Sequence, residues 1–236
     1  MWSIAKHESL QLLKSVKSIL ILLFLLGSAY AGVSVSELLK SFLELLNEGD
    51  LSIAENEAMI YSIGLSFTIL IFGPLFAFIL SHDVMNREIE QRTMRFIVTK
   101  VERKNIILGK VIGHLLFWFT ILTVSYILIF ILSGYFSIYA LSQSASFLAV
   151  FVSLALLLSM LIKKPIISSF LSILLGIAIP IVSLWAMFSE KWYISIFKYI
   201  SPYYYLEKNT MLFLVNFAFA AIYILVAIYL FRKRDV

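Results

Sequence analysis

Six long apolar runs constrain the fold of this chain more than any other feature of its sequence. Each run is close to the roughly 20 residues that an α-helix needs to cross the hydrocarbon core of a bilayer. The runs cover residues 19–35, 58–80, 111–132, 145–162, 166–188 and 211–231. Because a chain in lipid must satisfy its backbone hydrogen bonds internally, the pattern predicts an all-α, polytopic membrane protein with six transmembrane helices.

The composition excludes a soluble globular protein. Hydrophobic residues make up 61% of the chain and charged residues only 14%, whereas roughly half of a soluble domain is apolar. The six runs leave little chain for anything else, so we expect a single transmembrane domain over residues 1–236. Cysteine is absent, which rules out a disulfide framework, a thiolate metal site and a cysteine nucleophile.

The basic residues lie mainly on one side of the predicted spans. Fifteen of the nineteen Lys and Arg residues fall before the first span, or after the second, fourth and sixth spans. The positive-inside rule assigns this side to the cytoplasm. The sequence thus predicts a multi-pass protein of the plasma membrane with both termini cytoplasmic. Orientation also accounts for the formal charge of +5, so we expect no nucleic-acid partner.

Two segments outside the spans are predicted to lie along the membrane surface. Residues 1–18 place apolar residues at near-helical spacing among three lysines, which is typical of an interfacial helix. The alternative is that they form only the frayed start of the first span. Residues 189–210 form an external loop rich in Trp and Tyr, whose rings favour the headgroup region. A role of this loop in substrate gating is a second interpretation.

The spans contain no pattern that supports catalysis or ion coupling. Asp, Glu, Lys and Arg are absent from the middle of every predicted span, which argues against an ion-coupled carrier. A P-loop is excluded, because Gly109 and Lys110 are followed by Val111 and position 104 is not glycine. We therefore expect that the chain is not an enzyme and holds no cofactor or metal, and that any uphill transport draws its energy from another chain.

Two prolines interrupt predicted spans. Pro74 removes a helical hydrogen bond to the carbonyl of Leu70, and Pro180 removes one to the carbonyl of Gly176. The second and fifth spans should therefore bend at these positions. Such bends serve either as hinges or as simple packing features, and the sequence leaves both interpretations open.

The densest charge lies in the loop over residues 82–105, between the second and third spans. Met85, Ile89 and Phe96 share one apolar face there, which predicts an amphipathic cytoplasmic helix. Thr99 and Glu102 then fit a capping box, which predicts a break and a new helix that runs into the third span. Interleaved acids and bases suit a protein partner better than anionic lipid, although a merely solvated helix is the alternative.

The loop resembles that of ABC-2 type permeases, the membrane subunits of ATP-binding-cassette exporters. Their loop typically reads E-x-E-x-G-T, then a Pro and an Arg, then a Gly-Lys pair that leads into the third span. The matching residues are Glu88, Glu90, Thr93, Arg103, Gly109 and Lys110. Arg92 stands where the family usually has Gly, and Lys100 stands where it usually has Pro. The segment Ser201-Pro202-Tyr203 and the ending FRKRDV are also similar to the family.

The resemblance implies a permease that works with separate cytoplasmic ATPase subunits, which would carry the ATP and Mg. A second permease copy would complete a homodimer surrounded by membrane lipid. The resemblance also implies that residues 82–105 form a coupling loop that passes ATPase closure to the spans. The expected ATPase contacts are Glu88, Glu90, Arg92, Arg95, Arg103 and Lys104, and Thr93, Thr99 and Glu102 would set the geometry of the loop.

The sequence indicates the polarity of the substrate but not its identity. Largely apolar spans with scattered Ser and Thr fit a hydrophobic or amphiphilic substrate, such as a peptide, a drug or a lipid. The alternative function is a membrane anchor or sensor that recruits a cytoplasmic partner without transport. The charged loop suits both functions, so it does not decide between them.

Overall fold

The computed structural model describes residues 1–45, 57–162, 164–189, 191–206 and 211–233. These residues form helices and no strand. Six helices are long and apolar enough to cross a membrane: α2 (Val16–Leu45), α3 (Glu57–Ser81), α6 (Arg103–Ser133), α7 (Ile138–Leu161), α8 (Pro165–Phe188) and α10 (Val215–Lys233). The predicted all-α fold with six transmembrane helices is therefore confirmed over the described ranges, and the protein is a multi-pass membrane protein.

Some of these helices extend well beyond the apolar runs that predicted them. α6 begins at Arg103, ahead of the run over residues 111–132, and α2 continues to Leu45, past the run over residues 19–35. Apolarity marks only the part of a helix that suits the hydrocarbon core. The helical backbone itself can continue into the headgroup region, where charged side chains are solvated.

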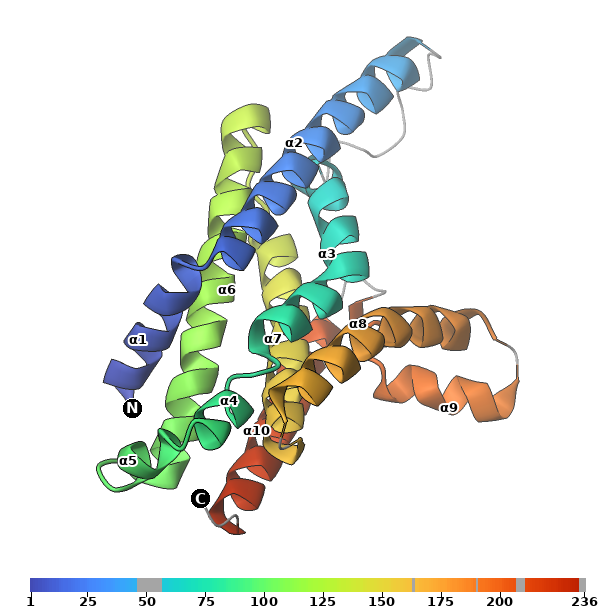
Figure 1. Cartoon of the computed structure of the whole chain (residues 1–236). Coiled ribbons are helices and arrows are strands. Elements are labelled where there is room, and N and C mark those ends of the chain that lie inside the picture. The colour runs from blue at the N-terminus through green and yellow to red at the C-terminus, as the bar shows by residue number, and fades with distance from the viewer. Residues whose placement is uncertain (46–56, 163, 190, 207–210, 234–236) are drawn as a thin grey trace.

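The remaining helical elements are shorter than these six helices. They are α1 (Trp2–Leu13), α4 (Asn86–Glu90), α5 (Met94–Val98), α9 (Trp192–Ile200) and the 3₁₀ turns η2 (Tyr204–Leu206) and η3 (Met211–Leu214). α1 ends before α2 begins and lies against α6 (Figure 1), so it is a separate helix and not the frayed start of the first span. Its position in the plane of the headgroups stays a prediction.

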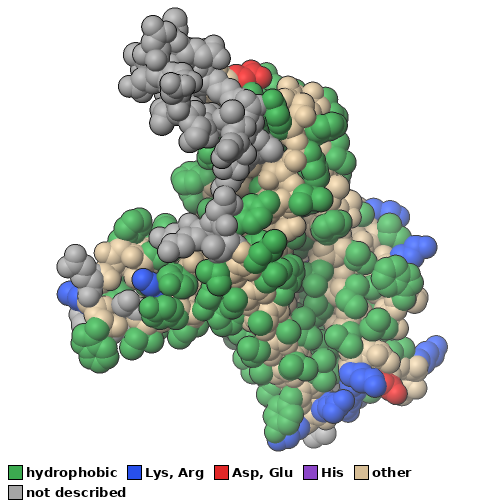
Figure 2. All heavy atoms as spheres, turned by 180° about the vertical axis from the view of Figure 1, so that it is seen from behind, with side chains coloured by type: hydrophobic (Ala, Val, Ile, Leu, Met, Phe, Trp, Pro, Cys, Tyr) green, Lys and Arg blue, Asp and Glu red, His purple; other side chains and the backbone are tan. Residues whose placement is uncertain are grey.

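α7 is the central helix of the bundle. It packs against α3, α6 and α10 and buries most of its side chains. The outer helices α2 and α8 expose many more of theirs. Figure 2 shows apolar side chains over the sides of the molecule, whereas Lys and Arg gather mainly toward the lower end in this view. An apolar outer surface of this kind suits contact with lipid.

α2 and α3 cross at two glycines. A Cβ atom added to Gly64 would lie 2.5 Å from the Cα atom of Gly32, so the two backbones are in contact. Next to this crossing, Ser36 Oγ donates a 3.2 Å hydrogen bond to the Ile60 carbonyl. In lipid, where burial of apolar surface drives association only weakly, small residues and interhelical hydrogen bonds hold helices together.

Pro74 lies inside α3, and the helix changes direction along its length (Figure 1). The Leu70 carbonyl accepts a 2.7 Å hydrogen bond from the hydroxyl of Tyr203, which follows α9. A Cβ atom added to Gly176 of α8 would lie 2.7 Å from the Cα atom of Leu75, so α8 also touches α3 here. At its bend, α3 thus meets both α8 and the segment that follows α9.

α8 and α9 form a hairpin that projects sideways from the bundle (Figure 1). Pro180 lies inside α8. α9 exposes Trp192, Phe197 and Tyr199, which suits the predicted position of this segment in the headgroup region. Whether Pro74 and Pro180 act as hinges stays a prediction.

Candidate functional site

The segment between α3 and α6 contains two one-turn helices, α4 and α5, in place of one amphipathic helix. Arg92 lies between them with φ of 61°, and it is the one non-glycine residue with positive φ in the described ranges. The prediction of a single helix is therefore wrong at this position. The resemblance places a Gly here, and Gly adopts positive φ without strain. Thr93 follows, and its hydroxyl donates a 3.2 Å hydrogen bond to the Glu88 carbonyl across the turn.

The predicted capping box is also wrong. α6 begins at Arg103 with Glu102 as its N-cap, and the Glu102 side chain makes no capping hydrogen bond. Thr99 is the C-cap of α5, and its hydroxyl donates to the Phe96 carbonyl at 2.8 Å. Its backbone is helical, whereas an N-cap residue normally has an extended backbone, so it cannot start α6. The break itself lies between Thr99 and Arg103, as expected.

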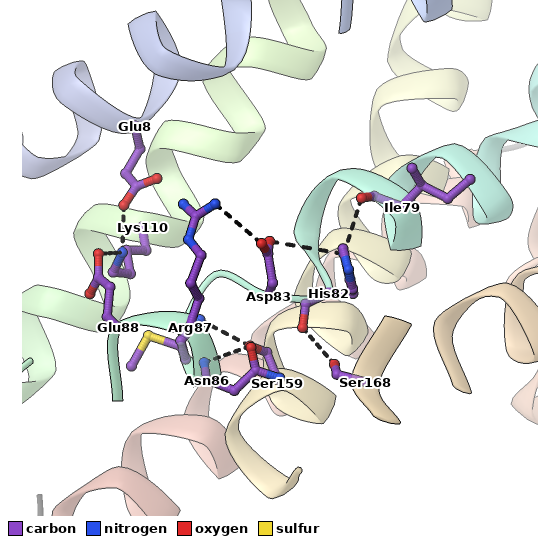
Figure 3. Close-up of polar contacts among 11 residues, drawn as sticks. Glu8, Ile79, His82, Asp83, Asn86, Arg87, Glu88, Lys110, Ser159 and Ser168 are labelled. Carbon is purple, nitrogen blue, oxygen red and sulfur yellow. Dashed lines mark hydrogen bonds and ion pairs between the residues drawn. The ribbon is translucent and has the colours of Figure 1, made fainter. Parts of the chain in front are cut away.

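A buried ammonium group lies beneath the loop. The side chain of Lys110, in the first turns of α6, is only 2% exposed. Its Nζ atom lies 2.7 Å from Oε1 of Glu88 in α4 and 2.5 Å from Oε1 of Glu8 in α1 (Figure 3). A charge is tolerated in a buried position when it has such partners. The three side chains, which we call the ionic cluster, join the loop to α1 and α6.

Two glycines bring α1 close enough for this contact. A Cβ atom added to Gly113 would lie 2.7 Å from Cβ of Glu8 and 2.8 Å from the Ala5 carbonyl oxygen. At Gly109 the added atom would lie 2.9 Å from Cβ of Ile4. The backbone of α1 therefore rests directly on α6. Gly109 leaves room for α1, and the next residue, Lys110, binds the carboxylate of Glu8 in α1.

Hydrogen bonds tie the beginning of the loop to α7 and α8. Ser159 Oγ of α7 accepts from the backbone N–H groups of Met85 at 2.9 Å and Asn86 at 3.2 Å (Figure 3). These groups lie at the start of α4, where N–H groups have no helical partner. Ser168 Oγ of α8 donates to the His82 carbonyl at 2.6 Å. The start of the loop is therefore bonded to two spans.

Arg103 ties the end of the loop to the end of α10. Its NH1 group donates to the carbonyls of Phe231 at 3.1 Å and Arg232 at 3.0 Å, and its guanidinium lies 5.8 Å from the Phe231 ring centre. The last carbonyls of a helix lack helical donors and carry partial negative charge. Arg103 satisfies two of them, so this predicted contact residue binds within the chain.

The opposite side of the loop is exposed. Among the exposed side chains of the loop, we call those of Glu90, Arg92, Arg95, Phe96 and Lys104 the outer face. Lys104 pairs with Glu102 at 3.2 Å, whereas Glu90, Arg92 and Arg95 make no ion pair within the described residues. Phe96 is 75% exposed, whereas Met85, which its spacing had placed on the same apolar face, is buried. A large exposed aromatic side chain among unpaired charges is typical of a protein contact surface.

The chain matches one known protein family over nearly its whole length. The family model described as "ABC-2 family transporter protein" matches residues 2–236. The chain belongs to the ABC-2 transporter family. No match to a curated protein was found. ABC-2 permeases are the transmembrane components of their transporters, are not themselves catalytic, and associate with a cytoplasmic ATP-binding subunit.

The ABC-2 loop motif has a physical basis in this protein. Glu88 of the E-x-E block and Lys110 of the Gly-Lys pair are bonded to each other. Arg92 occupies the position where ABC-2 permeases usually have Gly, and its backbone has the left-handed conformation that Gly favours. Some of the residues that match the family motif thus shape the loop itself.

Sequence reasoning missed Glu8 and Ser159 in this ABC-2 protein. Glu8 is one polar residue of an amphipathic helix, and its partner Lys110 lies 102 positions away. Ser159 is one of many scattered serines in apolar spans. The spacing of Gly109 and Gly113 was a usable signal, because two glycines one turn apart mark a face where another helix can approach closely.

The described part of this ABC-2 protein contains no group of three or more His, Asp or Glu residues placed to hold a metal ion. The two histidines nearest the loop make local hydrogen bonds instead. His82 Nδ1 lies 3.1 Å from the Ile79 carbonyl oxygen, and His114 Nδ1 lies 3.0 Å from that of Lys110. Both histidines are therefore held by backbone carbonyls of their own helices.

Proposed function

We propose that this ABC-2 protein is the permease subunit of an exporter that moves a hydrophobic or amphiphilic substrate out of the cytoplasm. Separate ATPase subunits bind and hydrolyse the ATP with Mg. The observation that carries this proposal is the two-sided loop between α3 and α6. Its inner side is bonded to α6 through Glu88, to α7 through the backbone at Met85 and to α10 through Arg103, and its outer face is open. A membrane anchor needs only the outer face, whereas transmission of movement needs both sides.

The ATPase docks on the outer face. Phe96 is its apolar centre, and Glu90, Arg92, Arg95 and Lys104 form a charged rim around it. An aromatic side chain surrounded by polar residues is the usual anatomy of a specific protein interface. In this proposal Glu88 and Arg103 do not touch the ATPase, because their side chains bind within the chain. They hold the loop in the position that the ATPase recognises.

Movement of the loop passes to the spans through its inner side. When the ATPases close, α4 pulls on α6 through Glu88 and Lys110, on α1 through Glu8, and on α7 through Ser159. Bonds between buried charges are costly to break, because a group that loses its partner stays desolvated. The loop and the ends of the spans therefore move together. Pro74 and Pro180 are the positions where α3 and α8 bend during this movement.

The transporter contains a second copy of this chain. One chain supplies six spans, and the outer surfaces of α2 and α8 remain apolar and exposed, for example at Phe24, Leu174 and Ile181. These surfaces meet either the second copy or membrane lipid. The homodimer lies in the plasma membrane with the loop and both chain termini on the cytoplasmic side, as the distribution of Lys and Arg predicts.

Purification from the native membrane tests the proposal. The unaltered chain is expected to bring an ATP-binding subunit with it, and Phe96→Ser or Glu90→Arg is expected to reduce the recovered subunit about tenfold or more. Lys191→Glu is the matched control, because Lys191 is an exposed cation beyond the other end of α8. A chain that purifies without an ATP-binding subunit, or outer-face variants that retain it fully, would contradict the proposal. The anchor or sensor function would then be favoured.

A further inference from the structure

A cavity of about 240 Å³ lies between α3 and α7, at the ends of these helices far from the loop. Ser62 and Ser66 line it from one face of α3, and Gln143 and Ser144 line it from α7. Leu206, in η2, contributes to its wall. Four polar side chains thus face one space in a part of the chain that is otherwise strongly apolar. We call this space the polar cavity.

A hydroxyl chain lies behind the polar cavity. The buried hydroxyl of Tyr126 in α6 lies 3.0 Å from Ser144 Oγ and 3.4 Å from Ser66 Oγ. Gln143 Nε2 donates to the Tyr139 hydroxyl at 3.1 Å and to the Leu206 carbonyl at 3.5 Å, whereas its own carbonyl oxygen has no partner within the described residues. Each hydroxyl can donate one hydrogen bond and accept two. The cavity therefore offers both donors and acceptors that are not fully used.

Among the residues that the structure describes, none of the side chains that line the polar cavity is charged. The rest of its wall is apolar and includes Ile69, Leu70 and Phe147. At its edge, Ile63 is 56% exposed and Phe67 is 62% exposed, so an apolar surface faces outward beside the polar groups. A charged group without a counter-charge is costly at membrane depth, whereas an uncharged polar group with hydrogen-bond partners is tolerated.

We propose that the polar cavity binds the uncharged, hydrogen-bonding head of an amphiphile, whose apolar tail lies against Ile63 and Phe67. Its role as a substrate site rests on the transport function proposed above. The volume suits one small head group, such as a single sugar ring, because cavities that hold drug-sized molecules are roughly 300–1,000 Å³. Uncharged amphiphiles are then preferred over anionic or cationic ones with the same tail.

Equilibrium binding of octyl glucoside to the full chain in lipid nanodiscs tests this proposal, with empty nanodiscs as the background. Octyl sulfate and octyltrimethylammonium have the same tail and serve as ionic competitors below their micelle concentrations. We expect saturable binding of the glucoside and little competition by either ionic amphiphile. Gln143→Leu is expected to weaken binding about tenfold, because the head group loses a hydrogen-bond partner.

A second variant and a control complete the test. Ser66→Ala with Ser144→Ala removes two oxygen atoms from the cavity and is expected to weaken binding even if Gln143→Leu does not fold. Ser142→Ala is the control, because the Ser142 hydroxyl donates to the Ile138 carbonyl of its own helix at 2.8 Å. Its binding should equal that of the unaltered chain.

Absence of saturable binding, equal affinity in the cavity variants, or equal binding of the ionic amphiphiles would overturn the proposal. This experiment needs no ATPase, so its outcome is separate from that of the proposed function. If the ATP-binding subunit co-purifies but the glucoside does not bind, only the cavity proposal fails. If the glucoside binds but no ATP-binding subunit is found, only the exporter function fails.

Discussion

The hydroxyl of Tyr203 donates a 2.7 Å hydrogen bond to the carbonyl of Leu70, the carbonyl that Pro74 leaves without a helical donor. The Tyr203 ring also packs against Phe147 of α7, with ring centres 4.9 Å apart. Burial raises the pKa of the Tyr203 phenol, so the donor proton is retained at neutral and mildly alkaline pH. The segment that follows α9 thus supplies a hydrogen-bond donor that α3 lacks at its bend.

Tyr203→Phe is expected to lower the stability of the purified chain by about 1–3 kcal/mol, because the buried Leu70 carbonyl loses its donor. In a Pro74→Ala background, the N–H group of residue 74 can bond that carbonyl, so the same change should cost much less. Thermal unfolding of the four proteins gives the coupling between the two positions. Equal costs in both backgrounds would contradict this relationship. Tyr205→Phe is the control, because the Tyr205 hydroxyl donates to the carbonyl of Tyr199 at an exposed position.

The pH dependence of this coupling follows from the direction of the Tyr203 pKa shift. The pKa in the folded protein lies above the value of about 10 in the unfolded chain. The stabilisation is therefore fully present below the unfolded pKa and is lost only as the pH rises through the folded pKa. The double-mutant coupling should be the same at neutral and mildly alkaline pH. A coupling that falls between these two conditions would mean that the phenol ionises more easily than its burial implies.

Arg92→Gly should stabilise the loop. A left-handed backbone costs an L-residue about 1–2 kcal/mol, and Gly avoids this cost while losing some entropy on folding. We expect a net gain of about 0.5–1 kcal/mol, measured as a rise in the unfolding temperature. Arg92→Ala is the matched control, since it removes the charge and keeps the strain. If both variants have the same stability, the charge of Arg92 and not its backbone conformation determines the result.

Lys110→Met should destabilise the chain strongly, by roughly 3 kcal/mol, because the carboxylates of Glu8 and Glu88 lose their shared cation in a largely buried place. The triple variant with Glu8→Gln and Glu88→Gln should recover most of this loss. Its coupling of ATP hydrolysis to transport should nevertheless fall, because the bonds between the loop, α1 and α6 are gone. Lys104→Met, which breaks the exposed pair with Glu102, should cost less than about 1 kcal/mol.

Gly113→Leu should separate α1 from α6. No side chain fits at Gly113, because even a Cβ atom would lie 2.7 Å from Cβ of Glu8. The chain contains no native cysteine, so spin labels can be placed at single introduced cysteines on α1 and on the exposed side of α6. We expect a longer and broader distance distribution in Gly113→Leu. Gly27→Leu is the control, because nothing lies within 4 Å of a Cβ atom at Gly27.

The sequence predicted the spans and the place of the loop, because both depend on local composition. Six apolar runs of membrane length require six helices, and the acids among the bases after the second run indicated a contact surface. Contacts between distant segments were not predictable in this way. Nothing local distinguishes Glu8 from other acids, and whether Glu88 turns inward or outward depends on where Lys110 lies. The Thr99 capping box failed for a related reason, since a motif of two residues does not fix the backbone conformation.

Photocrosslinking from position 96 in the native membrane tests the central claim most directly. A photoreactive phenylalanine in place of Phe96 lies at the centre of the outer face. We predict a crosslink to an ATP-binding subunit whose yield changes when ATP is added. The same residue in place of Trp192, at the start of α9, should give no such crosslink. Crosslinks from position 96 only to lipid, or to a protein that does not bind ATP, would contradict the claim that this loop couples ATP hydrolysis to transport.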